Sequence, residues 1–223
     1  MLVILEHKEY SYADMQELLL YHQRRGVRKQ FSALVKQMMK WGTDHEEDGC
    51  ATALRHLIDG TRGWGEQVGI LRLSGELSYV ATSPDLVLHM LVDNVWAEIP
   101  LEIKCPTPMF GNRFNGRMRI KHLIQVHIQM SALRAPFGYL CYWTQEAGYL
   151  YKIPFDHELW DRIKDGILNW RRAVERNAAQ APQTIQDKEL YKQVWERCEQ
   201  VYHNVLANGD YSTLPSCVAR PGK

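Results

Sequence analysis

The stretch Pro100-Leu101-Glu102-Ile103-Lys104-Cys105-Pro106-Thr107 decides the fold, because it places a carboxylate and an amine two residues apart in an apolar run. In a strand, this spacing directs the side chains of Glu102 and Lys104 to the same face. Ser83-Pro84-Asp85 separates two β-rich stretches, and a hairpin can bring Asp85 beside Glu102. Two adjacent carboxylates repel unless a cation lies between them, and Mg²⁺ prefers oxygen ligands. The pattern predicts a divalent-metal site suited to phosphodiester hydrolysis.

Length and composition favour one domain. The chain has 223 residues, 45% of them hydrophobic, which suffices for one sizeable α/β core. We expect a single domain over 1–223, with a helical N-terminal part (1–60), a catalytic core over about 41–176 and a C-terminal helical extension (177–223). Five widely spaced cysteines indicate neither a disulfide framework nor a metal cluster. The short apolar start and the lack of a long apolar run predict a soluble, intracellular protein without membrane contact.

Charge is unevenly distributed along the chain. The formal net charge is +1, yet the segment from Lys104 to Gln145 contains no Asp or Glu. Its basic residues are Lys104, Arg113, Arg117, Arg119, Lys121 and Arg134. Such a local excess suits a polyanionic partner, since Lys and Arg contacts to phosphates dominate nucleic-acid affinity. A merely solvated basic surface is the alternative.

The periodicity of apolar residues predicts alternating helical and extended regions. The first sixty residues have a helical pattern, in which a third helix starts at Trp41-Gly42-Thr43-Asp44, capped by Thr43 or Asp44, and runs to Gly60. Strands are expected over 67–73, 76–82, 86–92, 99–104, 138–144 and 148–153, and helices over 119–133, 156–176 and 186–206. The last helix is expected to carry one apolar stripe, formed by Leu190, Val194, Cys198, Val201 and Val205.

Four motifs, in this order, resemble those of the lambda exonuclease and YqaJ-like viral recombinase (alkaline exonuclease) family of the PD-(D/E)XK nuclease superfamily. They are Trp41-Gly42-Thr43-Asp44-His45-Glu46, Ser83-Pro84-Asp85, Leu101-Glu102-Ile103-Lys104-Cys105-Pro106 and Gln125-Val126-His127-Ile128-Gln129-Met130. The resemblance covers roughly residues 41–170. It implies an α/β fold with a restriction-endonuclease-like core, a mixed central β-sheet flanked by α-helices, and extra N- and C-terminal helices. Two positions depart from the family pattern: Leu86 replaces the usual Gly, and His127 replaces a frequent Gln.

The resemblance also implies roles for individual residues. The implied metal ligands are the side chains of Glu46, Asp85 and Glu102 and the backbone carbonyl of Ile103, with Mg²⁺ as the ion and Mn²⁺ able to substitute. Lys104 would orient the attacking water or stabilise the transition state. Gln125 would complete the catalytic set. The implied substrate-binding residues are Arg113, Arg117, Arg119, Lys121 and Gln129.

The implied activity is 5′-to-3′ exonuclease digestion of double-stranded DNA ends in viral or phage-type recombination. The implied partners are a single-strand annealing protein and further copies of the chain. Three alternatives stay open on the residues alone: an endonuclease, an RNA-cleaving nuclease of the same fold, and a nucleic-acid-binding module whose nuclease site has decayed. Glu47 and Asp48 compete with Glu46 as the first acidic residue. The glutamine face of helix 119–133 has a simpler alternative, the wet side of an amphipathic helix.

Overall fold

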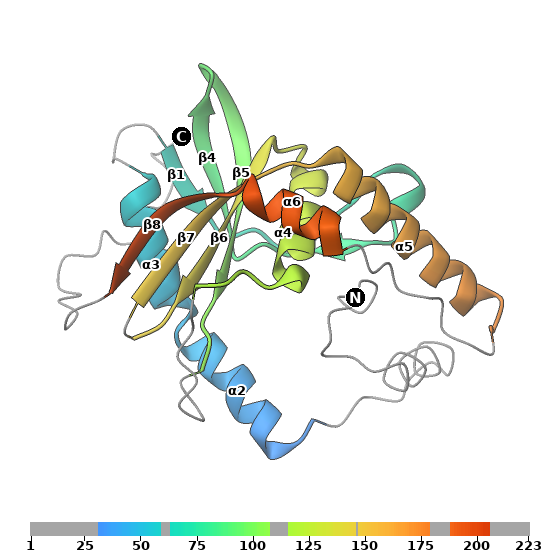
Figure 1. Ribbon diagram of the computed structural model, residues 1–223, viewed down its shortest axis with the longest axis horizontal. Coiled ribbons are helices and arrows are strands. Elements are labelled where there is room, and N and C mark those ends of the chain that lie inside the picture. Colours follow the sequence, from blue (N-terminus) through green and yellow to red (C-terminus); the bar gives the residue numbers. More distant parts are fainter. Residues whose placement is uncertain (1–30, 59–62, 108–115, 146, 179–187, 206–223) are drawn as a thin grey trace.

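A computed structural model describes residues 31–58, 63–107, 116–145, 147–178 and 188–205 (Figure 1). Its centre is a six-stranded sheet with the order β1-β4-β5-β6-β7-β8, in which only the β5–β6 pair is parallel. The strands are β1 (Gly63–Glu66), β4 (Leu86–Val92), β5 (Val95–Lys104), β6 (Phe137–Trp143), β7 (Ala147–Pro154) and β8 (Glu199–Val205). The predicted fold class, a mixed sheet flanked by helices, is confirmed.

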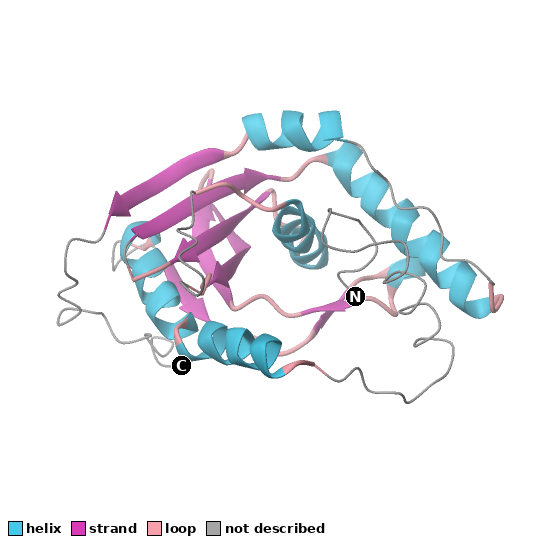
Figure 2. Ribbon diagram, turned by 60° about the horizontal axis from the view of Figure 1, so that its bottom comes forward, coloured by secondary structure: helices cyan, strands magenta, loops and turns pink. Residues whose placement is uncertain are grey.

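Helices cover both faces of this sheet (Figure 2). One face carries α3 (Glu46–Leu57), which follows α2 (Ala33–Asp44) after His45. The other face carries α4 (Ile120–Leu133), with α5 (His157–Glu175) against α4 and α6 (Lys188–Glu196) against α5. A small ribbon of β2 (Leu71–Arg72) and β3 (Ala81–Thr82), with a 3-10 turn over Gly75–Leu77, contacts α4.

Local sequence explains how β5 is placed. Asp93 and Asn94 both adopt positive φ, 49° and 63°, as the two-residue turn of a right-twisted hairpin requires, and they join β4 to β5. From Ile99 to Ile103 the strand is buried. The parallel β5–β6 pair needs a crossover, which α4 supplies. As a result, the end of β5 that carries Glu102 lies between β4 and β6, in the middle of the sheet.

Two glycines let the helices approach the sheet closely. A Cβ atom on Gly49 of α3 would lie 2.4 Å from Cγ2 of Ile103 on β5. On the opposite face, a Cβ atom on Gly138 of β6 would lie 2.7 Å from Cγ1 of Val126 on α4. Both gaps are too short for any larger residue without a backbone shift. Helices α3 and α4 therefore pack closely on opposite faces of the sheet at β5 and β6, and β5 carries Glu102 and Lys104.

Most predicted elements match the structure, and four differ from it in whole or in part. The strands at 86–92, 99–104, 138–144 and 148–153 and the helices at 119–133 and 156–176 are confirmed. The strands predicted over 67–73 and 76–82 are wrong: the strand that pairs with β4 is the four-residue β1, at Gly63–Glu66, and the predicted segments form only the short β2–β3 ribbon. The helix predicted to start at 41–44, capped by Thr43 or Asp44, begins at Glu46, because 41–44 end α2 and the chain leaves helical geometry at His45 (φ −115°, ψ 5°).

The helix predicted over 186–206 is confirmed only over Lys188–Glu196. Helix α6 ends at Glu196, and the chain continues as β8, which pairs with the edge of β7. That edge offers unpaired backbone groups, and alternating Val201 and Tyr202 suit a strand as well as a helix. The predicted apolar stripe is therefore split: Leu190 and Val194 are buried on α6, whereas Val201 is exposed on β8. The helical pattern within residues 1–30 lies outside the described residues, and every described helix is too short or too polar to serve as a membrane span.

Candidate active site

Asp85 is tied to β5 at the position between Glu102 and Lys104. Its Oδ2 accepts a hydrogen bond of 2.6 Å from the backbone N–H of Ile103. Burial first, and then the neighbouring charge of Glu102, raise the pKa of Asp85 to about 7. The hairpin predicted from the sequence therefore brings the two carboxylates together. Their mutual repulsion makes this a place where a cation is favoured.

Glu102 is almost completely buried, with 1% of its surface exposed, and three side chains surround its carboxylate. Lys104 Nζ pairs with Oε1, the Gln125 amide donates to Oε1, and the Gln129 amide donates to Oε2. A buried carboxylate needs such partners, because desolvation without them is costly. The two glutamines lie four residues apart on α4 and face the sheet. The alternative that this helix face is solvated does not hold for Gln129, which is fully buried.

Glu46 begins α3, whose N-terminus meets the end of β5. The Cys105 thiol, directly after the strand, donates to the backbone carbonyl of His45 at 3.1 Å. Burial and then the charge of Glu46 raise the pKa of Cys105 to about 12, so its thiol stays neutral. The charge of Glu46 also contributes to the raised pKa of Asp85. The structure thus brings Glu46 into electrostatic range of Asp85.

The competitors of Glu46 have other environments. Asp48 Oδ2 contacts His45 Nδ1 at 3.2 Å, and Glu47 is exposed. The His45 ring lies against Trp41, with ring centroids 4.0 Å apart, and stacks on Trp143 at 5.3 Å. These contacts fix the α2–α3 junction beside β6. They hold the start of α3, and with it Glu46, in place.

The donor chemistry of this cluster fits a hard divalent cation. Asp85 and Glu102 supply carboxylate oxygens whose crowding is already visible in the pKa of Asp85. Gln129 Oε1 is buried and has no hydrogen-bond partner in the described structure, so it can accept from a bound water. Within the described ranges, however, no three His, Cys, Asp or Glu side chains are already arranged as a metal site. The Lys104 ammonium group pairs with Glu102 where a metal ion would bind, so metal binding to Glu102 would require the Lys104 side chain to move.

A basic segment, defined here as residues 116–121, lies beside Lys104 and leads into α4. Two buried tyrosines hold its backbone: Tyr151 on β7 donates to the carbonyl of Gly116, and Tyr142 on β6 accepts from the N–H of Arg119 at 3.0 Å. Met118 is buried between these anchors. The remaining side chains of the segment, those of Arg117, Arg119, Ile120 and Lys121, are exposed or partly exposed. Arg113 lies outside the described residues.

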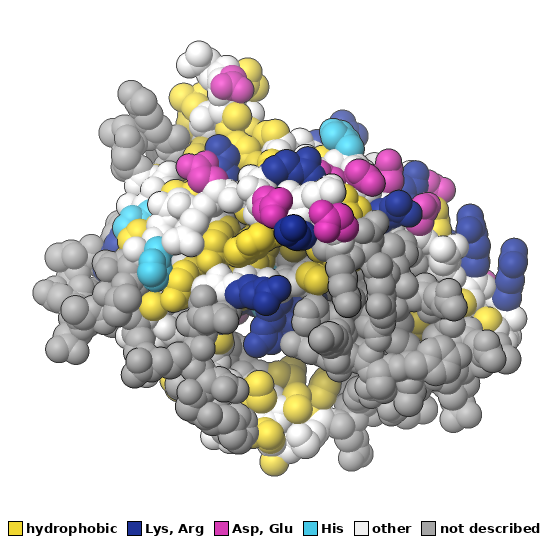
Figure 3. All heavy atoms as spheres, viewed as in Figure 1, with side chains coloured by type: hydrophobic (Ala, Val, Ile, Leu, Met, Phe, Trp, Pro, Cys, Tyr) yellow, Lys and Arg dark blue, Asp and Glu magenta, His cyan; other side chains and the backbone are white. Residues whose placement is uncertain are grey.

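The surface shows the same arrangement (Figure 3). Lysine and arginine side chains gather beside a hollow in the middle of this face, between the sheet and α2. Apolar side chains are visible on the α2 side of the hollow (Figure 3). Helix α2 exposes Leu34, Met38 and Met39. A basic patch beside buried carboxylates is suited to binding a polyanion such as a nucleic-acid backbone.

Sequence reasoning missed two residues of this site, His122 and Tyr142. Tyr142 Oη lies 2.7 Å from His122 Nδ1 and is also the acceptor for Arg119 N–H. His122 follows the predicted binding residue Lys121 by one position, so the basic run itself could have drawn attention to it. For Tyr142 the sequence carries no comparable signal, since only the parallel register places it opposite Lys104.

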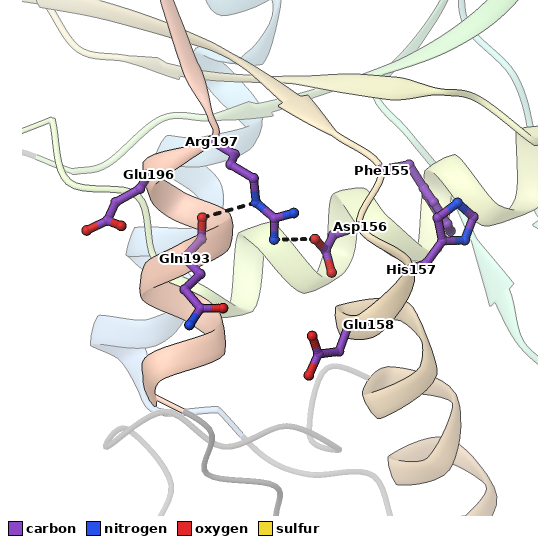
Figure 4. A pocket seen from close by; sticks show the side chains of 7 residues that line it. All are labelled: Phe155, Asp156, His157, Glu158, Gln193, Glu196 and Arg197. Carbon is purple, nitrogen blue, oxygen red and sulfur yellow. Dashed lines mark hydrogen bonds and ion pairs between the residues drawn. The ribbon is translucent and has the colours of Figure 1, made fainter.

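A second pocket lies away from these residues, between the start of α5 and the end of α6 (Figure 4). Its one cation, Arg197, pairs with Asp156 and donates to the backbone carbonyl of Gln193 at 3.3 Å. Asp156 in turn caps α5 by accepting from the N–H of Leu159 at 2.7 Å. The remaining charged side chains of the pocket are Glu158 and Glu196. These bonds join α5 to α6, and the pocket has the character of a structural junction.

Comparison with known proteins places the fold. No family model and no curated protein matches the sequence. Among solved structures, the alkaline exonuclease LHK-Exo from Laribacter hongkongensis is similar, with a TM-score of 0.56 and 15% identity over 87% of this chain and 91% of that chain. The structure of LHK-Exo in complex with dAMP gives a TM-score of 0.55 and 15% identity over 85% and 88% of the two chains. The chain therefore has the fold of an alkaline exonuclease, as its four motifs implied.

Proposed function

We propose that the protein is a metal-dependent deoxyribonuclease that hydrolyses phosphodiester bonds. The observation that carries this proposal is the convergence of Asp85, Glu102 and Lys104 on adjacent strands, with Glu46 at the same end of the sheet. The alkaline-exonuclease fold supports it, and the dAMP bound to LHK-Exo supports DNA as the substrate class.

The residues of the candidate site would have different roles in phosphodiester hydrolysis. Asp85, Glu102, Glu46 and the carbonyl of Ile103 would hold Mg²⁺, or Mn²⁺ in its place, and the ion lowers the pKa of bound water and neutralises charge on the phosphate. Gln125 and Gln129 fix the Glu102 carboxylate. With a metal bound at Glu102, Lys104 would be available to stabilise negative charge that develops on the scissile phosphate.

The basic segment would guide the DNA strand to these residues. Arg117, Arg119 and Lys121 stand next to Lys104, and Arg113 belongs to the same acid-free stretch of sequence. We propose further that digestion starts at double-stranded ends, runs 5′ to 3′ and serves viral or phage-type recombination. A single-strand annealing protein and further copies of the chain are the proposed partners.

The test is a cleavage panel. Purified protein is incubated with linear duplex DNA labelled at the 5′ or 3′ end, circular duplex DNA and single-stranded RNA, each with Mg²⁺ and with EDTA. We expect Mg²⁺-dependent loss of the 5′ label from linear duplex only. Cleavage of circular DNA or of RNA would establish the endonuclease or ribonuclease alternative. Binding without cleavage by a folded protein would establish the decayed module.

Substitutions of two lysines, one in the candidate site and one outside it, distinguish an effect on turnover from an effect on stability. Lys104→Ala is expected to lower turnover by roughly 10²–10³-fold. Lys164→Ala is the control, because Lys164 is partly exposed on α5 and pairs with Glu76. Turnover of Lys104→Ala close to that of the control would contradict the proposed role of Lys104.

A further inference from the structure

Tyr142 stands beside the proposed active site and touches the start of α4. It is the register partner of Lys104 in the parallel β5–β6 pair, so both side chains lie on the α4 face of the sheet. Its ring is fully buried. Its hydroxyl contacts two groups, the backbone N–H of Arg119 at 3.0 Å and His122 Nδ1 at 2.7 Å. The hydroxyl thereby fixes the orientation of the His122 ring.

These contacts suit one tautomer of His122. Burial raises the pKa of Tyr142, so the hydroxyl keeps its proton. The N–H of Arg119 donates to the hydroxyl oxygen, and the hydroxyl can in turn donate its proton to His122 Nδ1. A neutral imidazole that accepts at Nδ1 carries its own proton on Nε2. The described part of the chain provides no partner for this Nε2–H, and the ring is partly exposed.

The surroundings keep His122 neutral. Burial, followed by the charges of Lys104, Lys121 and Arg119, lowers the pKa of His122 to about 2. A protonated ring would add a fourth positive charge to this group. A neutral donor adds a directed hydrogen bond without that repulsion.

We propose that His122 is a substrate-binding residue whose Nε2–H donates a hydrogen bond to a non-bridging phosphate oxygen of the DNA strand held beside Lys104. The proposal rests on the proposed nuclease function. Phosphate is the ligand class that fits, because the neighbouring side chains are cationic and the donor is neutral. Tyr142 is the positioning residue, since its buried hydroxyl holds the ring of His122 and the backbone of Arg119 and is not itself the donor to phosphate.

Two isosteres distinguish this role from a structural one. In His122→Gln the amide nitrogen lies near the position of Nε2, so the donor to phosphate is retained. In His122→Asn the amide lies near the position of Nδ1, so only the contact with Tyr142 is retained. A binding role therefore predicts rescue by Gln, whereas a purely structural role predicts rescue by Asn.

The measurement is the affinity for a fluorescent duplex DNA in EDTA, followed by anisotropy over a series of salt concentrations. His122→Ala and His122→Asn are expected to bind about 10- to 100-fold more weakly than wild type, as for a lost hydrogen bond to a charged group. His122→Gln should regain most of the affinity. The slope of log K against log salt should stay unchanged in all three variants, because no charge is removed. Lys121→Ala should instead reduce the slope by about one.

Thermal melting of each variant accompanies the titrations. Equal DNA affinity in wild type and His122→Ala would overturn the proposal, and so would rescue by Asn rather than Gln. Tyr142→Phe, which releases both the His122 ring and the Arg119 N–H, should weaken binding less than His122→Ala does; a larger loss in a folded variant would contradict positioning through His122 and assign the effect of Tyr142 to the basic segment. A wild-type protein that neither binds nor cleaves DNA would overturn the proposed function itself. This outcome is recognised from the wild-type measurements alone, so it is distinct from a failure of the His122 proposal.

Discussion

At the residue scale, the active site is a balance of buried charge. Glu102 is buried with Lys104 as its counter-ion and two glutamine amides as further donors. Asp85 accepts a hydrogen bond from the Ile103 N–H, and burial and then the charge of Glu102 raise its pKa to about 7. The protein thus places the ion-paired Glu102 carboxylate beside a second carboxylate, Asp85, that is repelled by it. A bound divalent cation would relieve this repulsion and would compete with Lys104 for Glu102.

Asp85→Asn tests this balance. Asparagine still accepts a hydrogen bond from Ile103 N–H but carries no charge, so the metal-free variant should be at least as stable as wild type. Wild type should melt at a higher temperature with Mg²⁺ than in EDTA, because binding to the native state alone stabilises it. The variant should lose both this Mg²⁺-dependent rise and cleavage. An equal rise in both proteins, measured by scanning fluorimetry, would remove Asp85 from the metal site.

His127 gives a second residue-scale prediction, on stability rather than activity. Its Nδ1–H donates to the carbonyl of Leu123 at 2.9 Å, and its Nε2 accepts from the N–H of Asp156 at 3.3 Å. A second ring proton would face that N–H. Burial accordingly lowers the pKa of His127 from 6.5 to about 4.

The sign of the pH effect follows from this shift. Between pH 6.5 and 4 the unfolded chain binds the proton and the folded chain does not, so stability falls as pH falls. From this residue we expect a loss of about 2 kcal/mol in the free energy of unfolding between pH 7 and pH 5. Urea unfolding at both pH values measures it. A His127→Gln variant, which cannot titrate, should show a smaller loss, and an unchanged loss would assign the acid sensitivity to other groups.

At the scale of elements, helix α3 is the part that couples packing to the site. It carries Glu46 at its first turn and reaches the end of β5 through Gly49, whose missing side chain leaves room for Ile103. Helix α2 is different: it has no buried residue and only a short contact with α3. The position of Glu46 therefore depends on the α3–β5 contact.

Gly49→Ala should show this dependence. The new methyl group would collide with Ile103 Cγ2, at 2.4 Å, and push α3 away from the strand. We expect about 1–3 kcal/mol of destabilisation by urea unfolding, together with a loss of activity. Gly42→Ala on α2 is the matched control, because nothing lies within 4 Å of its new Cβ. It should gain up to about 1 kcal/mol, and equal effects of the two substitutions would refute the close-packing explanation.

At the scale of the whole molecule, the sheet gathers segments that are distant in sequence. Glu46, Asp85, Glu102 and the glutamines of α4 come from four elements or their ends, and β6 and β7 add the tyrosines that hold the basic segment against the sheet. Negative and positive groups thereby lie at different depths. The carboxylates of the candidate site are partly or fully buried, and the cations of the basic segment lie at the surface beside them.

This arrangement predicts a steep salt dependence of DNA binding. Each phosphate contact contributes about 0.9 to the slope of log K against log salt. Replacing Arg117, Arg119 and Lys121 together by Ala should therefore reduce the slope by about 2–3, measured by anisotropy. Arg171→Ala is the control, since Arg171 is on α5 and pairs with Glu175. A slope that is unchanged in the triple variant would remove the basic segment from the DNA path.

The sequence by itself determined the parts whose signal is local. Two-residue spacing in an apolar run placed Glu102 and Lys104 on one strand face, and four-residue spacing placed Gln125 and Gln129 on one helix face, because side-chain direction follows from backbone period alone. The mixed α/β fold followed from the order of four motifs. The ends of elements were less predictable where two structures suit the same residues, as in 186–206.

Only the tertiary structure decided which of these faces meet. The partners of Glu102, the tyrosine anchors of the basic segment and the contact between Tyr142 and His122 depend on strand register and on a parallel crossover. Strand β8 likewise forms because an edge of β7 is available to it. Contacts between distant segments depend on how all the helices and strands pack together. The local spacing of apolar and polar residues does not determine that packing.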